Sequence, residues 1–399
     1  MRAYLTVWRL PSAPVLLLAG FAGRLPSSMV PLALLLMVQQ QTGSYAVAGL
    51  AAASLGIASA GMAPVLGRLA DRKGPRRILL TQAALYPLLL GLLVAVTLGG
   101  APDVAVVAAS ALAGASTPLV SGTVRALWSR TDPRSRSTAY ALDATATELV
   151  FVAGPTMVAT LAVLAEPAWA VAVAGVLGVV GALGIGGAAR SWVSAPAPST
   201  GLFTTVLAPG MPRVLLSGSA VMLGFGALEV AIPAFADSAG SPGISGVLLA
   251  VWSLGSVAGG LWFGARVMSA SLPRQYRWLL FGVTIGLAPL AWVSSPWALG
   301  VLLFLGGTAI APTLTVQNSL VGSLAPVHAT TEAFTWLSTI TVGASAVGAA
   351  LGGALIETEA GIPGALVLAC LGAAAAVVVT LVPGRRAPAA AVPREPVPA

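Results

Sequence analysis

The chain has 399 residues, of which 57% are hydrophobic and only 8% are charged, and its formal net charge is +8. Soluble domains carry about a quarter of their residues as Asp, Glu, Lys and Arg, so the composition excludes a soluble globular domain. The basic residues are spread over many short loops, which excludes a continuous nucleic-acid-binding stripe. The chain has one histidine and one cysteine, His328 and Cys370, which cannot form a disulfide or a protein-only zinc site. We therefore expect no cofactor and no nucleic-acid partner.

Apolar runs long enough to cross a bilayer follow one another along the whole chain. A membrane-spanning helix needs about 20 mostly apolar residues, and the first six such runs cover 14–38, 44–66, 78–98, 104–127, 138–164 and 168–189. After a stretch rich in Pro, Ser and Gly, six more cover 214–236, 244–263, 278–293, 297–320, 331–356 and 362–382. The first run is too long for a signal peptide and holds Arg24 in its middle, so we expect it to stay in the mature protein.

These runs predict an all-α polytopic membrane protein with twelve transmembrane helices in two pseudo-symmetric six-helix bundles. We expect the N-terminal bundle over 1–189, a cytoplasmic connector over 190–212, the C-terminal bundle over 213–383 and a disordered cytoplasmic tail over 384–399. Arg and Lys occur in alternate loops. In the opposite loops the charged residues are all acidic, at Asp103, Glu166, Asp237, Glu357 and Glu359. By the positive-inside rule both termini are cytoplasmic, and we expect the protein in a bacterial cytoplasmic membrane.

An internal repeat relates the two halves. Three pairs of residues at matching places in their spans are each separated by the same 194 positions, namely Pro118 and Pro312, Ala139 and Ala333, and Gly154 and Gly348. Two parallel six-helix halves are a transporter plan in which the substrate site lies at the bilayer midplane between the halves.

The loop after the second span reads GRLADRKGPRR over residues 67–77. Its Gly67, Asp71, Arg72, Gly74 and Arg76 fall in a pattern that resembles the signature loop of the major facilitator superfamily. The resemblance implies a twelve-helix transporter in which this loop holds the two halves together on the cytoplasmic side in one state. Asp71 is then expected near a helix N-terminus, where negative charge is favoured. The alternative is a loop that only sets the topology.

The fifth span carries a second, partial resemblance. Gly154 and Pro155 match the glycine-rich motif of drug–proton exporters within that superfamily, whereas Val150, Val158 and Ala159 depart from it. The resemblance therefore favours drug– or metabolite–proton antiporters without establishing one.

Five ionisable residues are predicted to lie at membrane depth, where each costs at least about 2.5 kcal/mol and so marks a functional candidate. They are Arg24, Arg125, Asp143, Glu148 and Glu229. Counting from the ends of the spans predicts that Arg125 pairs with Asp143 near the cytoplasmic gate and that Arg24 pairs with Glu148 near the midplane. Glu229 is left without a basic partner and is one candidate proton carrier, and Glu148 is the other. The alternative is that these residues only hold helices together.

Uncharged polar residues complete the predicted substrate-binding or proton-coupling set of Arg24, Glu148, Glu229, Gln317, Asn318 and Trp336. Gln317 is the strongest of these, because an amide in lipid is costly without a partner. Trp336 lies beside Thr335, Ser338 and Thr339, which share a helix face. In the superfamily that the chain resembles, spans one, four, seven and ten line the central path.

The sequence thus predicts a secondary active transporter of a small molecule, working by alternating access and driven by protons. Efflux by antiport is the first interpretation and uptake by symport is the alternative. A membrane-embedded enzyme or a sensor is a third class, but no nucleophile–base group, nucleotide-binding loop or extramembrane domain favours it. We expect a monomer in the lipid bilayer. The substrate stays open, since Arg24 would suit an anion and Glu148 and Glu229 a cation.

Overall fold

The computed structural model describes residues 2–10, 12–191, 203–240, 244–266, 268 and 270–382, which form helices without a strand. The helices of the first half are α1 (Arg2–Trp8), α2 (Ala13–Thr42), α3 (Tyr45–Lys73), α4 (Pro75–Leu98), α5 (Asp103–Ala115), α6 (Val120–Ser129), α7 (Pro133–Leu164), α8 (Pro167–Ala188) and the 3₁₀ turn η1 (Ala189–Ser191). Those of the second half are α9 (Met211–Ser238), α10 (Ser245–Gly264), α11 (Leu272–Leu287), η3 (Ala288–Trp292), α12 (Pro296–Gly307), α13 (Ile310–Leu324), α14 (Thr330–Ile356) and α15 (Gly361–Leu381). Residues 192–202 of the predicted connector and the whole predicted tail, 384–399, lie outside the described residues.

The all-α membrane fold is confirmed, and the predicted count of twelve spans holds approximately. Eleven helical stretches in the described residues are long and apolar enough to cross a membrane. The ninth predicted span is the exception, because α11 has only 16 residues and continues as the short 3₁₀ helix η3. Large apolar side chains such as Leu88, Val163 and Trp297 face outward, as lipid contact requires.

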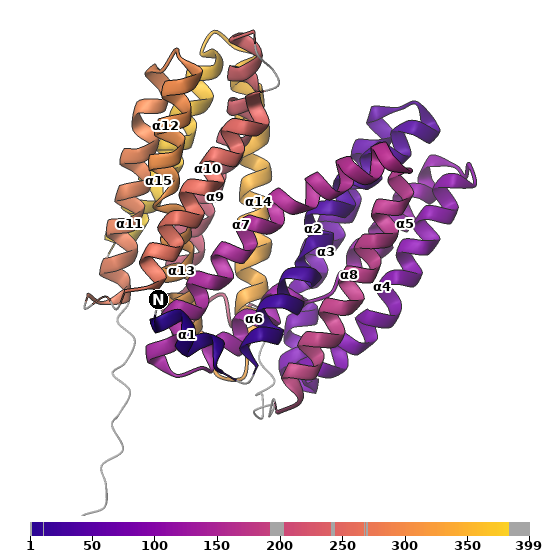
Figure 1. Cartoon of the computed structure of the whole chain (residues 1–399), viewed down its shortest axis with the longest axis horizontal. Coiled ribbons are helices and arrows are strands. Elements are labelled where there is room, and N and C mark those ends of the chain that lie inside the picture. The colour runs from indigo at the N-terminus through magenta and orange to yellow at the C-terminus, as the bar shows by residue number, and fades with distance from the viewer. Residues whose placement is uncertain are drawn as a thin grey trace, which may run out of the picture.

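The helices form two groups that meet at one end (Figure 1). Helices α2 to α8 make one bundle and α9 to α15 the other, and the two diverge toward the end away from the N-terminus. Helices α6, α7 and α14 lie where the bundles meet. We call the end with α1 and the Lys73 end of α3 the closed end.

At the closed end the two bundles touch along two lines of contact, which we call the α3–α14 seam and the α7–α10 seam. The same type of glycine contact occurs in each. A Cβ atom on Gly67 of α3 would lie 2.5 Å from Thr335 Oγ1 on α14, and one on Gly264 of α10 would lie 2.5 Å from Ala141 Cβ on α7. Gly67 and Gly264 are 197 positions apart, and Ala141 and Thr335 are 194 apart. The internal repeat is therefore a repeat of three-dimensional contacts.

The fourth span is broken between α5 and α6, at the position of Pro118. Buried Gln82 on α4 bridges the break with its side-chain amide, whose Nε2 donates to the Thr117 carbonyl at 2.8 Å. Its Oε1 accepts from the Leu119 amide at 3.0 Å. Backbone groups inside a membrane need partners within the protein, so Gln82 makes the break tolerable. Sequence reading missed this role, although Pro118 inside an apolar run was the available signal.

Candidate functional site

Asp71, in the last turn of α3, holds α3 and α14 together through hydrogen bonds at the α3–α14 seam. Its carboxylate accepts hydrogen bonds from the backbone amides of Thr331 at 3.1 Å and Glu332 at 2.8 Å. These amides belong to the first turn of α14, whose own cap residue, Ala329, offers no side-chain acceptor. Asp71 thus caps a helix of the opposite bundle, and the prediction that it lies at a helix N-terminus is confirmed.

Glu332 lies at the centre of the same seam and was missed by the sequence analysis. It is 3% exposed, and its Oε1 has no hydrogen-bond partner. Arg68 and Arg72 lie within electrostatic reach of its carboxylate, and Thr205 and Trp336 are adjacent to it. The seam is therefore a network of charges from both bundles, and Arg130 lies within electrostatic reach of Asp71.

The other residues of loop 67–77 have separate roles. Gly74 has φ +89°, a conformation that favours glycine, and it allows α4 to begin directly after α3. Arg72 is exposed and acts on Glu332 through its charge. Arg76 is exposed and lies beside Gly186 near the end of α8, away from the seam.

At the closed end, α7 and α10 are joined along their seam by a hydroxyl–carbonyl hydrogen bond and by close glycine contacts. The Thr138 hydroxyl on α7 donates to the Gly264 carbonyl at 2.8 Å, and a Cβ atom on Gly260 would lie 3.0 Å from Thr145 Oγ1. The Tyr4 hydroxyl of α1 donates to the Leu261 carbonyl of α10 and so covers this seam from the N-terminus.

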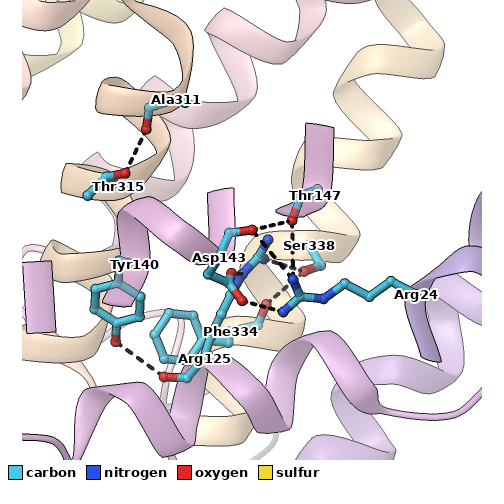
Figure 2. Close-up of polar contacts among 9 residues, drawn as sticks. All are labelled: Arg24, Arg125, Tyr140, Asp143, Thr147, Ala311, Thr315, Phe334 and Ser338. Carbon is cyan, nitrogen blue, oxygen red and sulfur yellow. Dashed lines mark hydrogen bonds and ion pairs between the residues drawn. The ribbon is translucent and has the colours of Figure 1, made fainter. Parts of the chain in front are cut away.

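Three charged residues of the first bundle form a single group, which we call the arginine–aspartate cluster (Figure 2). Arg24 on α2 and Arg125 on α6 both bind the carboxylate of Asp143 on α7. Arg24 contacts Oδ1, and Arg125 Nε donates to Oδ2 at 3.1 Å. The expected pair of Arg125 and Asp143 is therefore present.

The expected pair of Arg24 and Glu148 is wrong, because Arg24 binds Asp143 instead. Residues 143 and 148 are five apart on one helix, which places their side chains about 140° apart around its axis. Arg24 lies on the side that Asp143 faces. Counting depth alone had matched Arg24 to Glu148 and Arg125 to Asp143, whereas in the structure one Asp143 carboxylate binds both arginines.

Not every hydrogen-bond donor of the two arginines has a partner at normal distance. Arg24 Nη1 reaches the Asp143 carbonyl at 3.5 Å and Thr147 Oγ1 at 3.4 Å, and Arg24 Nε is buried without a partner. Arg125 Nη1 reaches Ser338 Oγ on α14 at 3.4 Å, which connects the cluster to the opposite bundle.

Glu148 and Glu229 approach each other from opposite bundles, and we call them the carboxyl pair. Glu148 on α7 lies within electrostatic reach of Glu229 on α9 and next to the Ser256 hydroxyl on α10. Ser256 Oγ is fully buried and makes no hydrogen bond of normal geometry. Glu148 is half-buried and Glu229 is exposed.

The remaining candidates are dispersed. Gln317 and Asn318 on α13 are each 3% exposed. Gln317 packs on Gly218 of α9, and its Nε2 has no partner. The Trp336 ring packs on Phe203 with centroids 5.4 Å apart. Trp336 therefore lies against the described end of the connector, at the seam rather than beside the carboxyl pair.

Two pseudo-symmetric helical bundles that meet at one end, with charged groups between them, define a polytopic membrane transporter. The sequence matches the Major Facilitator Superfamily over residues 16–264, which is more than half of the chain. The chain belongs to this superfamily, as loop 67–77 indicated, and is a multi-pass transporter of a small molecule rather than an enzyme.

Solved structures share the fold across almost their whole length. A bacterial homologue of the iron transporter ferroportin, in its outward-facing state, is similar with TM-score 0.77 and 16% identity, covering 93% of this chain and 99% of that one. The human organic anion transporter MFSD10 (TETRAN) is similar with TM-score 0.72 and 14% identity, covering 93% and 100%. At these identities the similarity shows the fold and not the cargo. No curated protein sequence matches this chain.

Proposed function

We propose that the protein is a proton-coupled secondary transporter that works by alternating access and exports its substrate. The carboxyl pair is the observation that carries this proposal. Glu148 and Glu229 come from different bundles, and among the described residues neither forms an ion pair, whereas Arg24, Arg125 and Asp143 bind one another. The carboxyl pair is thus the part of the interior where charge changes with proton binding.

Electrostatics gives the coupling its physical basis. Two carboxylates within electrostatic reach of each other repel when both are ionised, and the repulsion grows as their separation falls, so binding a proton to either one relieves it. Rotation of one bundle against the other changes the separation of Glu148 and Glu229 and the side from which they are reached. A proton taken up on one side can then be released on the other.

We assign the closed end to the cytoplasm, because loop 67–77 lies there and is rich in Arg and Lys. The structure then corresponds to an outward-open state with both termini inside the cell. The similarity to an outward-facing ferroportin homologue supports this assignment.

Export is favoured by the partial exporter motif in α7. Gly154 of this motif lets α7 approach α2, since a Cβ atom there would lie 1.9 Å from Ser28 Oγ. Export also implies antiport, in which substrate and proton move in opposite directions.

Proteoliposomes with an imposed pH gradient and an interior pH dye test the proposal. Substrate-dependent proton movement is expected in the wild type and in Glu166→Gln, a control at an exposed carboxyl outside the pair. Glu148→Gln and Glu229→Gln should each abolish it. Because the proposal assigns both groups to one coupling step, the double variant should lose no more coupling than either single one.

The direction of proton movement separates the alternatives. Movement opposite to the substrate supports antiport, and movement with the substrate would replace export by uptake through symport. Substrate transport that ignores both the pH gradient and the two substitutions would refute proton coupling.

A further inference from the structure

We infer that the arginine–aspartate cluster is a binding site for an anion, so that the substrate carries a carboxylate, phosphate or sulfonate group. The inference deepens the proposed function by naming the substrate class, and it rests on transport through the space between the bundles. Its evidence is the charge, the unsaturated hydrogen bonds and the location of the cluster.

The cluster holds two guanidinium groups against one carboxylate. Asp143 uses one oxygen for each arginine, so both of its oxygens are engaged. In the described part of the chain, the charges that act on Arg24 are Asp143 and Arg125. One positive charge therefore remains without a counter-charge, and an uncompensated charge inside a protein is costly. A single negative charge from a ligand would remove that cost.

Hydrogen bonding in the cluster is also incomplete. Apart from their bonds to the Asp143 carboxylate, the oxygens that the two arginines reach among the described residues are neutral and lie at 3.4 to 3.5 Å, near the limit for a hydrogen bond. Arg24 Nε has no partner at all. The planar guanidinium group offers paired donors that match the oxygens of a carboxylate or phosphate, so an oxyanion fits the free donors better than water or a neutral solute does.

Arg125 is the member of the cluster that a ligand can reach first. Its side chain is 15% exposed, whereas those of Arg24 and Asp143 are 4% and 1% exposed. Arg125 also touches Ser338, which lies about one turn along α14 from Thr335, the residue packed on Gly67 at the closed end. The cluster thus lies next to the α3–α14 seam at the closed end.

This location connects binding to the conformational change. An anion that takes the terminal nitrogens of Arg125 competes with Ser338, the contact that joins the cluster to the opposite bundle. Binding would therefore loosen one inter-bundle contact while it neutralises the cluster.

Equilibrium binding to the purified full-length protein in detergent tests the inference. Benzoate, phenyl phosphate and benzenesulfonate are compared with the neutral benzamide and the cationic benzylamine, and binding is measured as a rise in the melting temperature. We expect at least one of the anions to stabilise the wild type, and benzamide and benzylamine to have no effect. Arg190→Gln, which removes an exposed arginine away from the cluster, should respond like the wild type.

Arg125→Gln should weaken anion binding by about ten- to a hundredfold, which is the loss expected for hydrogen bonds to a charged group. Arg125→Lys keeps the charge but loses the paired donors, and it should weaken binding to an intermediate degree even if the Gln variant fails to fold. Stabilisation by benzylamine, no response to any of the three anions, or an anion response that survives in both Arg125 variants would overturn the inference.

A lipid headgroup could present the same phosphate chemistry. Repeating the measurement after exhaustive delipidation distinguishes the two sources, because a solute site keeps its response to the soluble anions. A response that requires added anionic lipid would refute a solute anion as the ligand. No pH gradient is imposed, so failure of proton coupling at Glu148 and Glu229 and failure of anion binding are separate results.

Discussion

The carboxylate of Asp71 accepts a hydrogen bond from the backbone amide of Glu332 at 2.8 Å, across the boundary between the two bundles. The bond exists only while the closed end is closed, because Asp71 belongs to α3 and the amide to α14. Together with the bond from the Thr331 amide, it couples the capping of a helix to the conformational state of the transporter.

Replacing Asp71 by Asn should shift the protein toward opening at this end. The variant loses a charge at a helix N-terminus and one of two capping bonds, which together contribute about 1–2 kcal/mol. That is about a five- to thirtyfold change in the ratio of closed to open molecules. Spin labels on exposed Lys73 and Arg266, in a Cys370→Ser background, would report a longer distance between the ends of α3 and α10. Asp103→Asn, an exposed carboxyl at the other end of the first half, is the matched control, and an unchanged distance in Asp71→Asn would contradict the role assigned to this bond.

Gly67 should tolerate no side chain in the closed state. A Cβ atom there would lie 2.5 Å from Thr335 Oγ1 and 3.1 Å from Glu332 Cα, so Gly67→Ala is expected to destabilise the closed seam by about 1–3 kcal/mol. On the same helix, a Cβ atom on Gly61 would meet nothing within 4 Å, which makes Gly61→Ala an ideal control. The same pair of spin labels would show a widened closed end only for Gly67→Ala. Equal effects of the two substitutions would mean that helix propensity, and not contact, decides the outcome.

The two sides of the arginine–aspartate cluster should respond unequally to neutralisation. Asp143→Asn leaves two guanidinium groups facing each other without a carboxylate, and removing one partner of a buried ion pair costs about 3–5 kcal/mol. Arg24→Gln leaves the pair of Arg125 and Asp143 intact and should cost clearly less. Thermal unfolding of the two purified variants checks this order. If Arg24→Gln proved the more damaging, the excess positive charge assigned to the cluster would be wrong.

Gln82→Leu should destabilise the protein through the break in the fourth span. It removes the partners of the Thr117 carbonyl and the Leu119 amide, and each orphaned group costs about 1–3 kcal/mol. Gln82→Glu keeps, in its protonated form, an acceptor for Leu119 and a hydroxyl donor for Thr117, so at acidic pH its melting temperature should fall by a smaller amount. Thr81→Val on the same helix, at an exposed position, controls for the substitution of a polar residue in α4.

The sequence predicted those features that depend on one helix at a time. The spans follow from hydropathy, and the place of Asp71 follows from a motif that is local in sequence. The partner of Arg24 was not predictable in this way, because counting residues gives the depth of Asp143 and Glu148 but not the side of α7 on which each lies. Glu332 was missed for a related reason, since the second half carries no local motif that marks it. Trp336 was assigned to the substrate-binding set because polar residues lie beside it on α14. Its contact with Phe203 was not predictable, because that contact depends on where the connector reaches the second bundle.

The hydrogen bonds between Asp71 and α14 affect which substitutions the protein can accept. The two hydrogen bonds that Asp71 accepts at 2.8 and 3.1 Å come from the main chain of α14, so nearly any residue at positions 331 and 332 would still supply the two amides. Proline is the exception, because it has no backbone N–H to donate. A change of side chain at position 331 or 332 therefore leaves the two amide donors in place, whereas a change at Asp71 removes the carboxylate that accepts from both of them.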